Sequence, residues 1–542
     1  MSQDPLSRIR NRTRPSGAER ERSFFPQATY RSSFLQSDAE RWGAETGQPL
    51  GTALRQVARA HLIQLAEQRI LTTEHAAAGL QALSQPPNAP TWQHPVLDQL
   101  AASIAATEGG LLSGSSTEEL SALASRMAVR DAVLGLHGDL LSVREGLATV
   151  ATAHLTTLLL LTLDGQATQP STLAHLLMAW IDALVRDSER VQQLWERVNV
   201  APAGAVMGIA TAMPIQRARL AALLGFAGVV PNTIDALAGN DWLLEVGTTS
   251  GIIAATLRRC ITTLQHFARA DVGLLVPEDA YLHADPALPQ LREPRVLTAL
   301  AQQVHAVSAA AADLLLQPAS GDALDSRATR EQQVTQVLDL VAALRASLRQ
   351  LREVMETAVV NRAMFANRAN RGFTTSAELL DLLVQDYAFT REKALELVNR
   401  IVVEATERGL ESATLRTTLV DEIALKVTGV ELGIEEETLA ACLAPKRVIE
   451  RRTMEGGPAA AQVRHALERH GFRLRRAREW ETGLRTERER ASQALDERVV
   501  VGIADPQTLQ RPRRRVGETT PDTESDTAPS LTFPERRPTD VT

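Results

Sequence analysis

One uninterrupted helical pattern limits how this 542-residue chain can fold more than any other feature. From Glu118 to Thr162 the pattern is helical and contains no proline. A helix of that length approaches about 65 Å at about 1.5 Å per residue, which is longer than a small domain is wide. A helix this long needs partners of similar length, so the pattern predicts an elongated helical bundle.

Four further segments with few prolines support this prediction. They run at roughly 171–199, 234–270, 294–317 and 328–365, with turn-rich links between them. Aromatic residues make up only 4% of the chain, and β-branched runs bounded by turns are scarce. We therefore expect an all-α protein whose broad apolar helix faces favour oligomerisation.

Changes in composition divide the chain into five predicted parts. They are a disordered N-terminal lead at 1–25, an N-terminal helical lobe at 26–115, the central long-helix bundle at 116–365, a C-terminal helical lobe at 366–474, and a charged helix with a disordered tail at 475–542. The bundle is the largest part, and we expect it to set the overall shape.

Charge and cysteine content argue against several classes of protein. The formal net charge of −7 gives no reason to expect nucleic acid or a membrane as partner. Cys260 and Cys442 lie far apart within helical patterns, which favours a reducing compartment over a disulfide framework. The N-terminus lacks an apolar signal segment and LTTLLLLTL is too short to span a bilayer, so we expect a cytoplasmic protein. No metal-ligand spacing or phosphate loop occurs, and we expect no metal and no cofactor.

Four segments match the motifs of one known family in the same order. RDSERVQQLWERVNVAPAGAVMGIATAMPIQRARLAALLGF, residues 186–226, contains R-[VI]-N-x-x-P-x-G followed by P-I-x-R and L-G-F. The later segments are NTIDALAGNDWLLE, TTSAELLDLLVQDYAFTREKALELV and VIERRTMEGGPAAAQVRHAL. Over roughly residues 30–470 the chain therefore resembles argininosuccinate lyase, of the fumarase/aspartase superfamily.

The resemblance implies both an assembly and a reaction. Members of the family are homotetramers whose central helices form one shared bundle, and each active site draws on several subunits. Their reaction is a β-elimination that breaks a C–N bond and releases fumarate. It needs a base, an acid and groups that hold carboxylates.

The loop that carries the family's base has lost its chemistry in this chain. The family's G-S-S-x-M-P-Q-K-K-N-P supplies a serine base, with a lysine and an asparagine that bind carboxylate. Aligned through Leu288, Pro289 and Gln290, it becomes DPALPQLREP here. The positions of its serines, lysines and asparagine are now Asp285, Pro286, Leu291, Arg292 and Glu293.

Three other family motifs are also replaced. T-H-x-Q, whose histidine takes part in acid/base chemistry, becomes LDGQ, with Asp164 for the histidine and Gln166 unchanged. S-R-N-D, which binds the substrate carboxylate, becomes TEEL at 117–120 and brings in Glu118 and Glu119. Y-N-x-D-L-Q-E-D-K-E, which recognises the guanidino end, becomes LDSRATREQQ at about 324–333, and Asn240 replaces a family arginine.

These replacements would turn attraction into repulsion. A carboxylate such as Glu119 or Glu293 about 4 Å from a substrate carboxylate costs on the order of 4 kcal/mol at an effective dielectric near 20. The first lysine of the chain is Lys393, so only arginines such as Arg292 or Arg295 are available near the loop to compensate.

Three functions remain open. The first is a catalytically degenerate family member that serves as a structural, regulatory or partner subunit, for example in a mixed oligomer with an active paralogue. The second is an active lyase of the superfamily that uses His283, Asp285 or Asp164 as acid/base groups. The third is a housekeeping argininosuccinate lyase of arginine biosynthesis, which the missing serine, histidine, lysine and asparagine disfavour.

Plainer interpretations of the same residues also stand. Asp164 precedes a glycine and suits a turn, and His283 suits an ordinary surface loop. His175 has helical neighbours, so we expect it to pack or to make a structural hydrogen bond. Cys260 on an amphipathic helix suits a small core residue.

Overall fold

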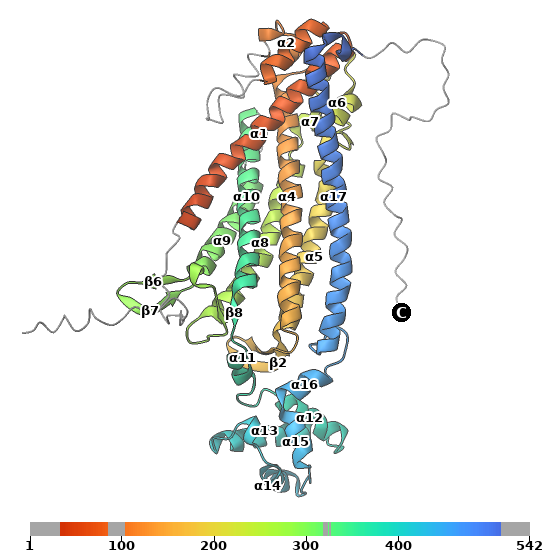
Figure 1. Ribbon diagram of the computed structural model, residues 1–542. Helices are drawn as coiled ribbons and strands as arrows, with labels where there is room; N and C mark the ends of the chain where they lie inside the picture. The colour runs from red at the N-terminus through yellow and green to blue at the C-terminus, as the bar shows by residue number, and fades with distance from the viewer. Residues whose placement is uncertain (1–32, 85–102, 104, 318–323, 325–326, 511–542) are drawn as a thin grey trace, which may run out of the picture.

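In the computed structural model, six long helices build an elongated bundle (Figure 1). The structure describes residues 33–84, 103, 105–317, 324 and 327–510. The bundle helices are α4 (Thr117–Ala153), α5 (Leu173–Val198), α8 (Asp241–Ala268), α9 (Arg295–Leu316), α10 (Arg327–Thr357) and α17 (Ala460–Ala504). Their arrangement confirms the predicted all-α fold class. The predicted lead at 1–25 and residues 511–542 of the predicted tail lie outside the described residues.

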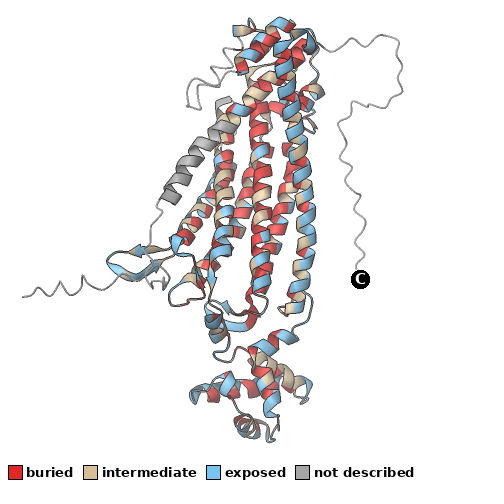
Figure 2. Ribbon diagram, viewed as in Figure 1, coloured by how far each residue is buried: buried red, intermediate tan, exposed pale blue. Residues whose placement is uncertain are grey.

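A continuous apolar core holds the bundle together. α4 packs against α5, α10 and α17, and most of its side chains are buried (Figure 2). The core draws on all six helices, for example through Leu140, Trp180, Leu257, Leu300 and Leu344. Burying one such side chain stabilises the fold by about 1.5–3 kcal/mol, so the bundle rests on many similar contributions.

The first bundle helix is shorter than its sequence pattern predicts. α4 ends at Ala153, and the predicted continuation to Thr162 is wrong, because the leucine-rich run forms strand β1 (Leu158–Leu163) instead. This strand pairs antiparallel with β2 (Gln166–Thr172). Periodicity alone does not separate a short apolar strand from a helix continuation, since both bury the same residue types.

The N-terminal helices share a second core with the end of α17. α1 (Ser33–Glu67) and α2 (Thr73–Ser84) pack there with α6 (Arg217–Leu223), the start of α4, and the short 3-10 helix η5 (Pro506–Leu509). The side chain of Glu67 is fully buried and forms ion pairs with Arg219 of α6 and Arg498 of α17. α17 is therefore built into this end of the molecule.

The predicted boundary between residues 474 and 475 lies inside α17. The helix runs unbroken from Ala460 to Ala504 and crosses the length of the bundle (Figure 1). Its buried face is a narrow stripe at heptad spacing that includes Val463, Ala477 and Leu484. The other faces are charged, so composition alone cannot show that the helix packs against the bundle.

The C-terminal lobe has a core of its own. It contains α12 (Ser376–Gln385), α13 (Arg391–Glu407), η4 (Ser412–Thr414), α14 (Thr417–Thr428) and α15 (Glu436–Leu443). α11 (Arg362–Ala369) precedes it, and α16 (Pro445–Arg451) joins it to α17. Figure 1 shows this lobe beyond the end of the bundle where α17 begins.

Short elements complete the described chain. The remaining helices are η2 (Gly110–Leu112), α7 (Thr233–Ala238) and η3 (Asp279–Tyr281). The remaining strands form three more two-stranded pairs: β3 (Val200–Ala201) with β4 (Gly228–Val229) in parallel, and, antiparallel, β5 (Leu275–Val276) with β8 (Val359–Val360) and β6 (His283–Asp285) with β7 (Leu288–Glu293).

One described helix, α9, is long and apolar enough to cross a membrane by length and composition alone. It packs against α8 and α10 in the bundle, yet only 28% of its most apolar window is buried within the chain. Its outward face therefore presents apolar surface.

Candidate active site

The start of α4 is fixed by a side-chain cap. The hydroxyl of Ser116 accepts a hydrogen bond from the Glu119 N–H at 3.1 Å and donates one to the Val206 carbonyl at 2.5 Å. A serine at the N-cap with glutamate at the third helical position is a strong helix-start signal. The same serine thus begins the helix and connects it to a loop ninety positions later.

Glu119 is buried beneath that loop. Its two carboxylate oxygens accept hydrogen bonds from the backbone N–H groups of Gly204 at 2.6 Å and Val206 at 2.9 Å, and the residue is only 1% exposed. Burial raises the pKa of Glu119, and the two backbone donors oppose that shift. The carboxylate is therefore turned inward, which removes the repulsion predicted between it and a substrate carboxylate.

Arg217 holds the far side of the same loop. Its guanidinium donates hydrogen bonds to the carbonyls of Ala203, Val230 and Pro231 at 2.6, 2.5 and 3.1 Å. Gly204 has a positive φ of 68°, and a Cβ there would lie 2.5 Å from Cγ of Arg217. A glycine is therefore needed both for the turn and for the close approach of the arginine.

The first turns of α10 complete one side of the site. Nη1 of Arg330 lies 3.5 Å from a carboxylate oxygen of Glu118, and the hydroxyl of Ser121 donates to Glu331 at 3.0 Å. The segments of two different replaced motifs, 117–120 and about 324–333, are thus in direct contact. Their charged groups pair with each other.

A small pocket lies between α4, α10 and the start of α8. Asn240 is the N-cap of α8 and lines the pocket without a side-chain capping bond. The buried hydroxyl of Ser125 also lines it and has no hydrogen-bond partner. The other polar lining residues are Arg126, Arg330 and Gln333.

Arg126 is the buried cation of this pocket. It donates to the Arg197 carbonyl at 2.9 Å, and its guanidinium lies 4.4 Å from the ring centroid of Trp242. Burial lowers the pKa of Arg126 to about 10, with Asp241 and Asp235 opposing the shift. The group stays charged at neutral pH and is able to hold an anion.

The predicted residue Asp164 lies at the tip of the β1–β2 hairpin. Asp164 and Gly165 both have positive φ, 50° and 78°, and they connect the paired residues Leu163 and Gln166. Both Asp164 and Gln166 are exposed. The geometry is that of a two-residue hairpin turn, in agreement with the turn interpretation of Asp164.

The other predicted residues lie on the β6–β7 hairpin. His283 pairs with Glu293 across the two strands, and Gln290 is exposed on β7. The Asp285 carboxylate accepts a hydrogen bond from the Ala287 N–H at 2.7 Å. Two ion pairs brace the hairpin, between Arg292 and Asp279 at 2.9 Å and between Glu293 and Arg295 at 3.0 Å.

One chain does not bring together the Glu119 site, the β1–β2 hairpin and the β6–β7 hairpin. The Glu119 site lies at the start of α4, whereas the β1–β2 hairpin follows its other end, about 55 Å away along a 37-residue helix. Figure 1 places the β6–β7 hairpin away from both, beside the lower part of the bundle. A site that combines all three would need more than one copy of the chain.

Comparison with curated proteins decides the family. An argininosuccinate lyase from Methanothrix thermoacetophila is 30% identical over 346 residues, which are 63% of this chain and 69% of that protein. The chain belongs to the argininosuccinate lyase family. A second relative, from Methanoculleus marisnigri, is 29% identical over 372 residues, 69% of this chain and 74% of its own length. A family model described as lyase matches residues 93–304.

Solved structures give the same fold. An EDDS lyase variant with bound fumarate has a TM-score of 0.80 at 24% identity, covering 89% of this chain and 98% of its own. A fumarate lyase from Mesorhizobium sp. BNC1 has a TM-score of 0.65 at 18% identity, covering 80% and 97%. The argininosuccinate lyase family member described here thus has the helical bundle of the fumarase/aspartase superfamily.

The start of α4 also favours a one-residue shift of the S-R-N-D motif. Its N-cap is Ser116, and aligning the motif's serine with this residue puts Thr117 in place of the arginine and Glu119 in place of the aspartate. An acid is then kept at the last position, and the charge lost is that of the arginine. The TEEL alignment at 117–120 has no such serine.

Sequence reasoning missed the buried polar groups that shape the pocket. Arg126 and Ser125 lie in an apolar helical run, where their burial and contacts cannot be read from periodicity. Arg217 is the arginine of the P-I-x-R motif, and the motif alone does not reveal that this side chain holds the loop. The ring nitrogens of His175 form hydrogen bonds with the Ser171 hydroxyl and the Gly456 carbonyl, both at 2.9 Å. These contacts fit the predicted structural hydrogen bond.

Proposed function

We propose that this family member keeps the lyase scaffold without argininosuccinate lyase activity and acts as a structural, regulatory or partner subunit. One observation carries the proposal: the motif positions at the start of α4 make internal contacts. Glu119 bonds two backbone amides, and Glu118 pairs with Arg330. These positions hold a substrate carboxylate in the family, whereas here they offer carboxylates engaged within the chain and no cation, which suits a dianionic substrate poorly.

The replaced hairpins support the same proposal. A β-elimination needs a base beside the carbon acid and an acid beside the leaving nitrogen. Asp164 occupies a left-handed turn position, and the Asp285 carboxylate accepts a hydrogen bond from the backbone N–H of Ala287. The backbone of Asp164 suits its turn and the Asp285 carboxylate accepts a hydrogen bond within its own loop, so no catalytic role is required to explain either residue.

Self-association is part of the proposal. The outward faces of α8 and α9 carry exposed apolar side chains, including Ile252, Leu315 and Leu316, which are 45%, 57% and 81% exposed. Covering these faces in a homotetramer would remove the apolar surface from water. We also propose a cytoplasmic location. A molecular mass in solution of one chain would exclude the tetramer.

Fumarate release tests the central claim. Purified full-length protein is incubated with argininosuccinate and fumarate is followed by its ultraviolet absorbance, beside an active argininosuccinate lyase as control. We expect no turnover from folded protein. Turnover within about a hundredfold of the control contradicts the proposal. That limit corresponds to a difference of about 2.7 kcal/mol in activation free energy.

A second function, an active lyase with replaced acid/base groups, is favoured by one feature of the β6–β7 hairpin. His283 and Asp285 lie two residues apart on β6, with Arg292 on the neighbouring strand. In that case His283→Ala abolishes C–N cleavage of the true substrate. His465→Ala on the exposed side of α17 is the matched control and leaves turnover unchanged.

A mixed oligomer with an active paralogue is one specific form of the partner function. Affinity purification of the tagged chain from its own cells, followed by mass spectrometry, then recovers a second family member in a constant ratio. Recovery of this chain alone, in repeated purifications, excludes the mixed oligomer but leaves a homotetramer possible.

A further inference from the structure

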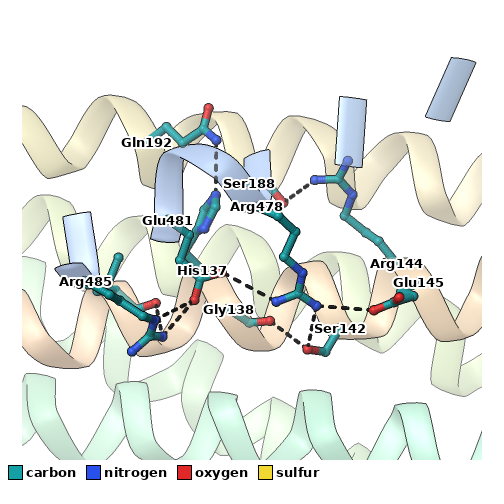
Figure 3. Close-up of polar contacts among 11 residues, drawn as sticks. His137, Gly138, Ser142, Arg144, Glu145, Ser188, Gln192, Arg478, Glu481 and Arg485 are labelled. Carbon is teal, nitrogen blue, oxygen red and sulfur yellow. Dashed lines mark hydrogen bonds and ion pairs between the residues drawn. The ribbon is translucent and has the colours of Figure 1, made fainter. Parts of the chain in front are cut away.

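A polar seam runs between α17 and the pair α4 and α5, away from the candidate active site. Figure 3 shows three arginines, Arg144, Arg478 and Arg485, and one histidine, His137, in this seam. Arg478 and Arg485 both pair with the buried carboxylate of Glu481, at 3.5 and 2.7 Å, and Arg478 also pairs with Glu145 at 3.3 Å. These two arginines are therefore neutralised within the chain.

Arg144 in the same seam is different. It is only 2% exposed, it donates to the hydroxyl of Ser188 at 3.1 Å, and its Nε has no hydrogen-bond partner (Figure 3). Among the described residues, no carboxylate lies within ion-pair distance of it. Burial lowers the pKa of Arg144 to about 10, Glu189 opposes this, and Arg473 and Arg478 add to it. The guanidinium is thus a buried cation without an anion in contact.

His470 lies beside Arg144 and is also without a partner. It is 3% exposed, and neither ring nitrogen makes a hydrogen bond, although the Arg144 backbone lies near the ring. Burial lowers the pKa of His470 to about 4, with Arg144 and Arg473 contributing. A neutral imidazole has one N–H donor, and a buried donor without an acceptor is costly.

His470 lines an open cleft of about 420 Å³ between α5 and α17. The α17 wall carries Arg469, His470 and Arg473, which share one face of the helix. The α5 wall carries Arg186 with two carboxylates, Asp182 and Glu189. Arg469 is paired with Glu455, whereas no ion pair joins Arg186 or Arg473 to a described carboxylate.

We propose that this cleft binds a small oxyanion, the phosphate or carboxylate group of a metabolite, against the α17 wall. Arg473 is the direct contact, while His470, whose ring nitrogens are buried, and Arg144 lie beneath this wall, where Arg144 contributes positive charge. Guanidinium N–H groups form strong, charge-assisted hydrogen bonds with such oxygens. The volume lies within the range of small-molecule sites, about 300–1,000 Å³.

The carboxylates of the α5 wall limit how much negative charge the ligand can carry. Asp182 and Glu189 face the same cleft and repel a polyanion such as a triphosphate, while they tolerate a single anionic group or one with a cationic end. The site is also separate from the candidate active site. Arg144 lies 25 positions beyond Glu119 on α4, which is about 37 Å along the helix. The proposal therefore stands independently of the proposed function.

Calorimetric titration of the full chain tests the proposal. Inorganic phosphate and acetate are titrated separately at constant ionic strength, with chloride as the control anion because exposed charges are screened by salt. We expect saturable binding of at least one probe. Phosphate alone points to a phosphate-bearing metabolite, acetate alone to a carboxylate, and no saturable heat beyond chloride overturns the proposal.

Two matched variants locate the binding. Arg473→Glu should weaken binding about tenfold or more, since it replaces a charge-assisted contact with a repulsive one. Arg475→Glu makes the same charge change on an exposed face of α17 that does not line the cleft, and it should leave binding unchanged. Both residues are exposed, so both variants should fold with the wild-type unfolding temperature. Equal weakening by the two variants overturns the proposal, because it shows general electrostatic attraction.

Discussion

The buried carboxylate of Glu67 gives the sharpest test of how α17 is held. Its oxygens accept hydrogen bonds from Nε and Nη2 of Arg219 at 3.0 and 2.8 Å, and it also pairs with Arg498. Its side chain has no exposed surface, so water does not replace a lost partner. Glu67→Gln keeps the shape but leaves two guanidinium groups against a neutral amide. We expect a loss of about 3–5 kcal/mol in the free energy of unfolding.

Urea unfolding followed by circular dichroism at a fixed protein concentration measures this loss. The control is Glu489→Gln, which removes an exposed carboxylate from α17 and should change stability by less than about 0.5 kcal/mol. Combining Glu67→Gln with Arg498→Ala should give a coupling energy above about 1 kcal/mol. A loss below about 1 kcal/mol in the free energy of unfolding would refute the reasoning, and so would additive effects of the two single substitutions. Either result would mean that these ion pairs contribute no more than solvent-exposed ones.

Three further predictions concern buried groups. Burial raises the pKa of Cys260 to about 12, so its thiol should react with a disulfide reagent only after denaturation, and rapid reaction of folded protein contradicts this. Burial lowers the pKa of His137 to about 3, so the unfolded chain binds a proton below about pH 6.5 that the folded chain does not. His137 alone should lower the free energy of unfolding by about 1.4 kcal/mol per pH unit as pH drops below that value, and His137→Gln should remove this part of the slope in thermal unfolding. A Cβ on Gly138 would lie 2.5 Å from Glu481, so Gly138→Ala should cost about 1–3 kcal/mol in urea unfolding, whereas Gly483→Ala, which meets nothing within 4 Å, should not destabilise.

The helical periodicity predicted most of the fold because bundle helices bury one face along their whole length. The segments predicted at 171–199 and 294–317 coincide closely with α5 and α9. The pattern was wrong between Ala153 and Thr162, where cross-strand pairing with β2 overrides the apolar run. Strand pairing is a contact between separate segments, so it leaves no trace in local spacing.

The candidate site was predictable only in part. The motifs located the segments around Glu118, Glu119 and Asn240, but not that the first two are engaged by Arg330 and by backbone amides. The sequence does not distinguish a glutamate that faces solvent from one that is buried and accepts hydrogen bonds from two N–H groups. Their chemical roles differ because burial and hydrogen bonding set the charge that a ligand meets.

The sequence by itself determined most of the long helices, through local spacing, and the residue types at the motif positions, through the resemblance of the motifs to the family. Only the tertiary structure decided that α17 belongs to the bundle, that Glu119 points inward, and that His470 and Arg144 meet beside a cleft. Each of those facts joins residues far apart in the chain. Such contacts are chosen by the packing of whole helices, so they exist only once the bundle has formed.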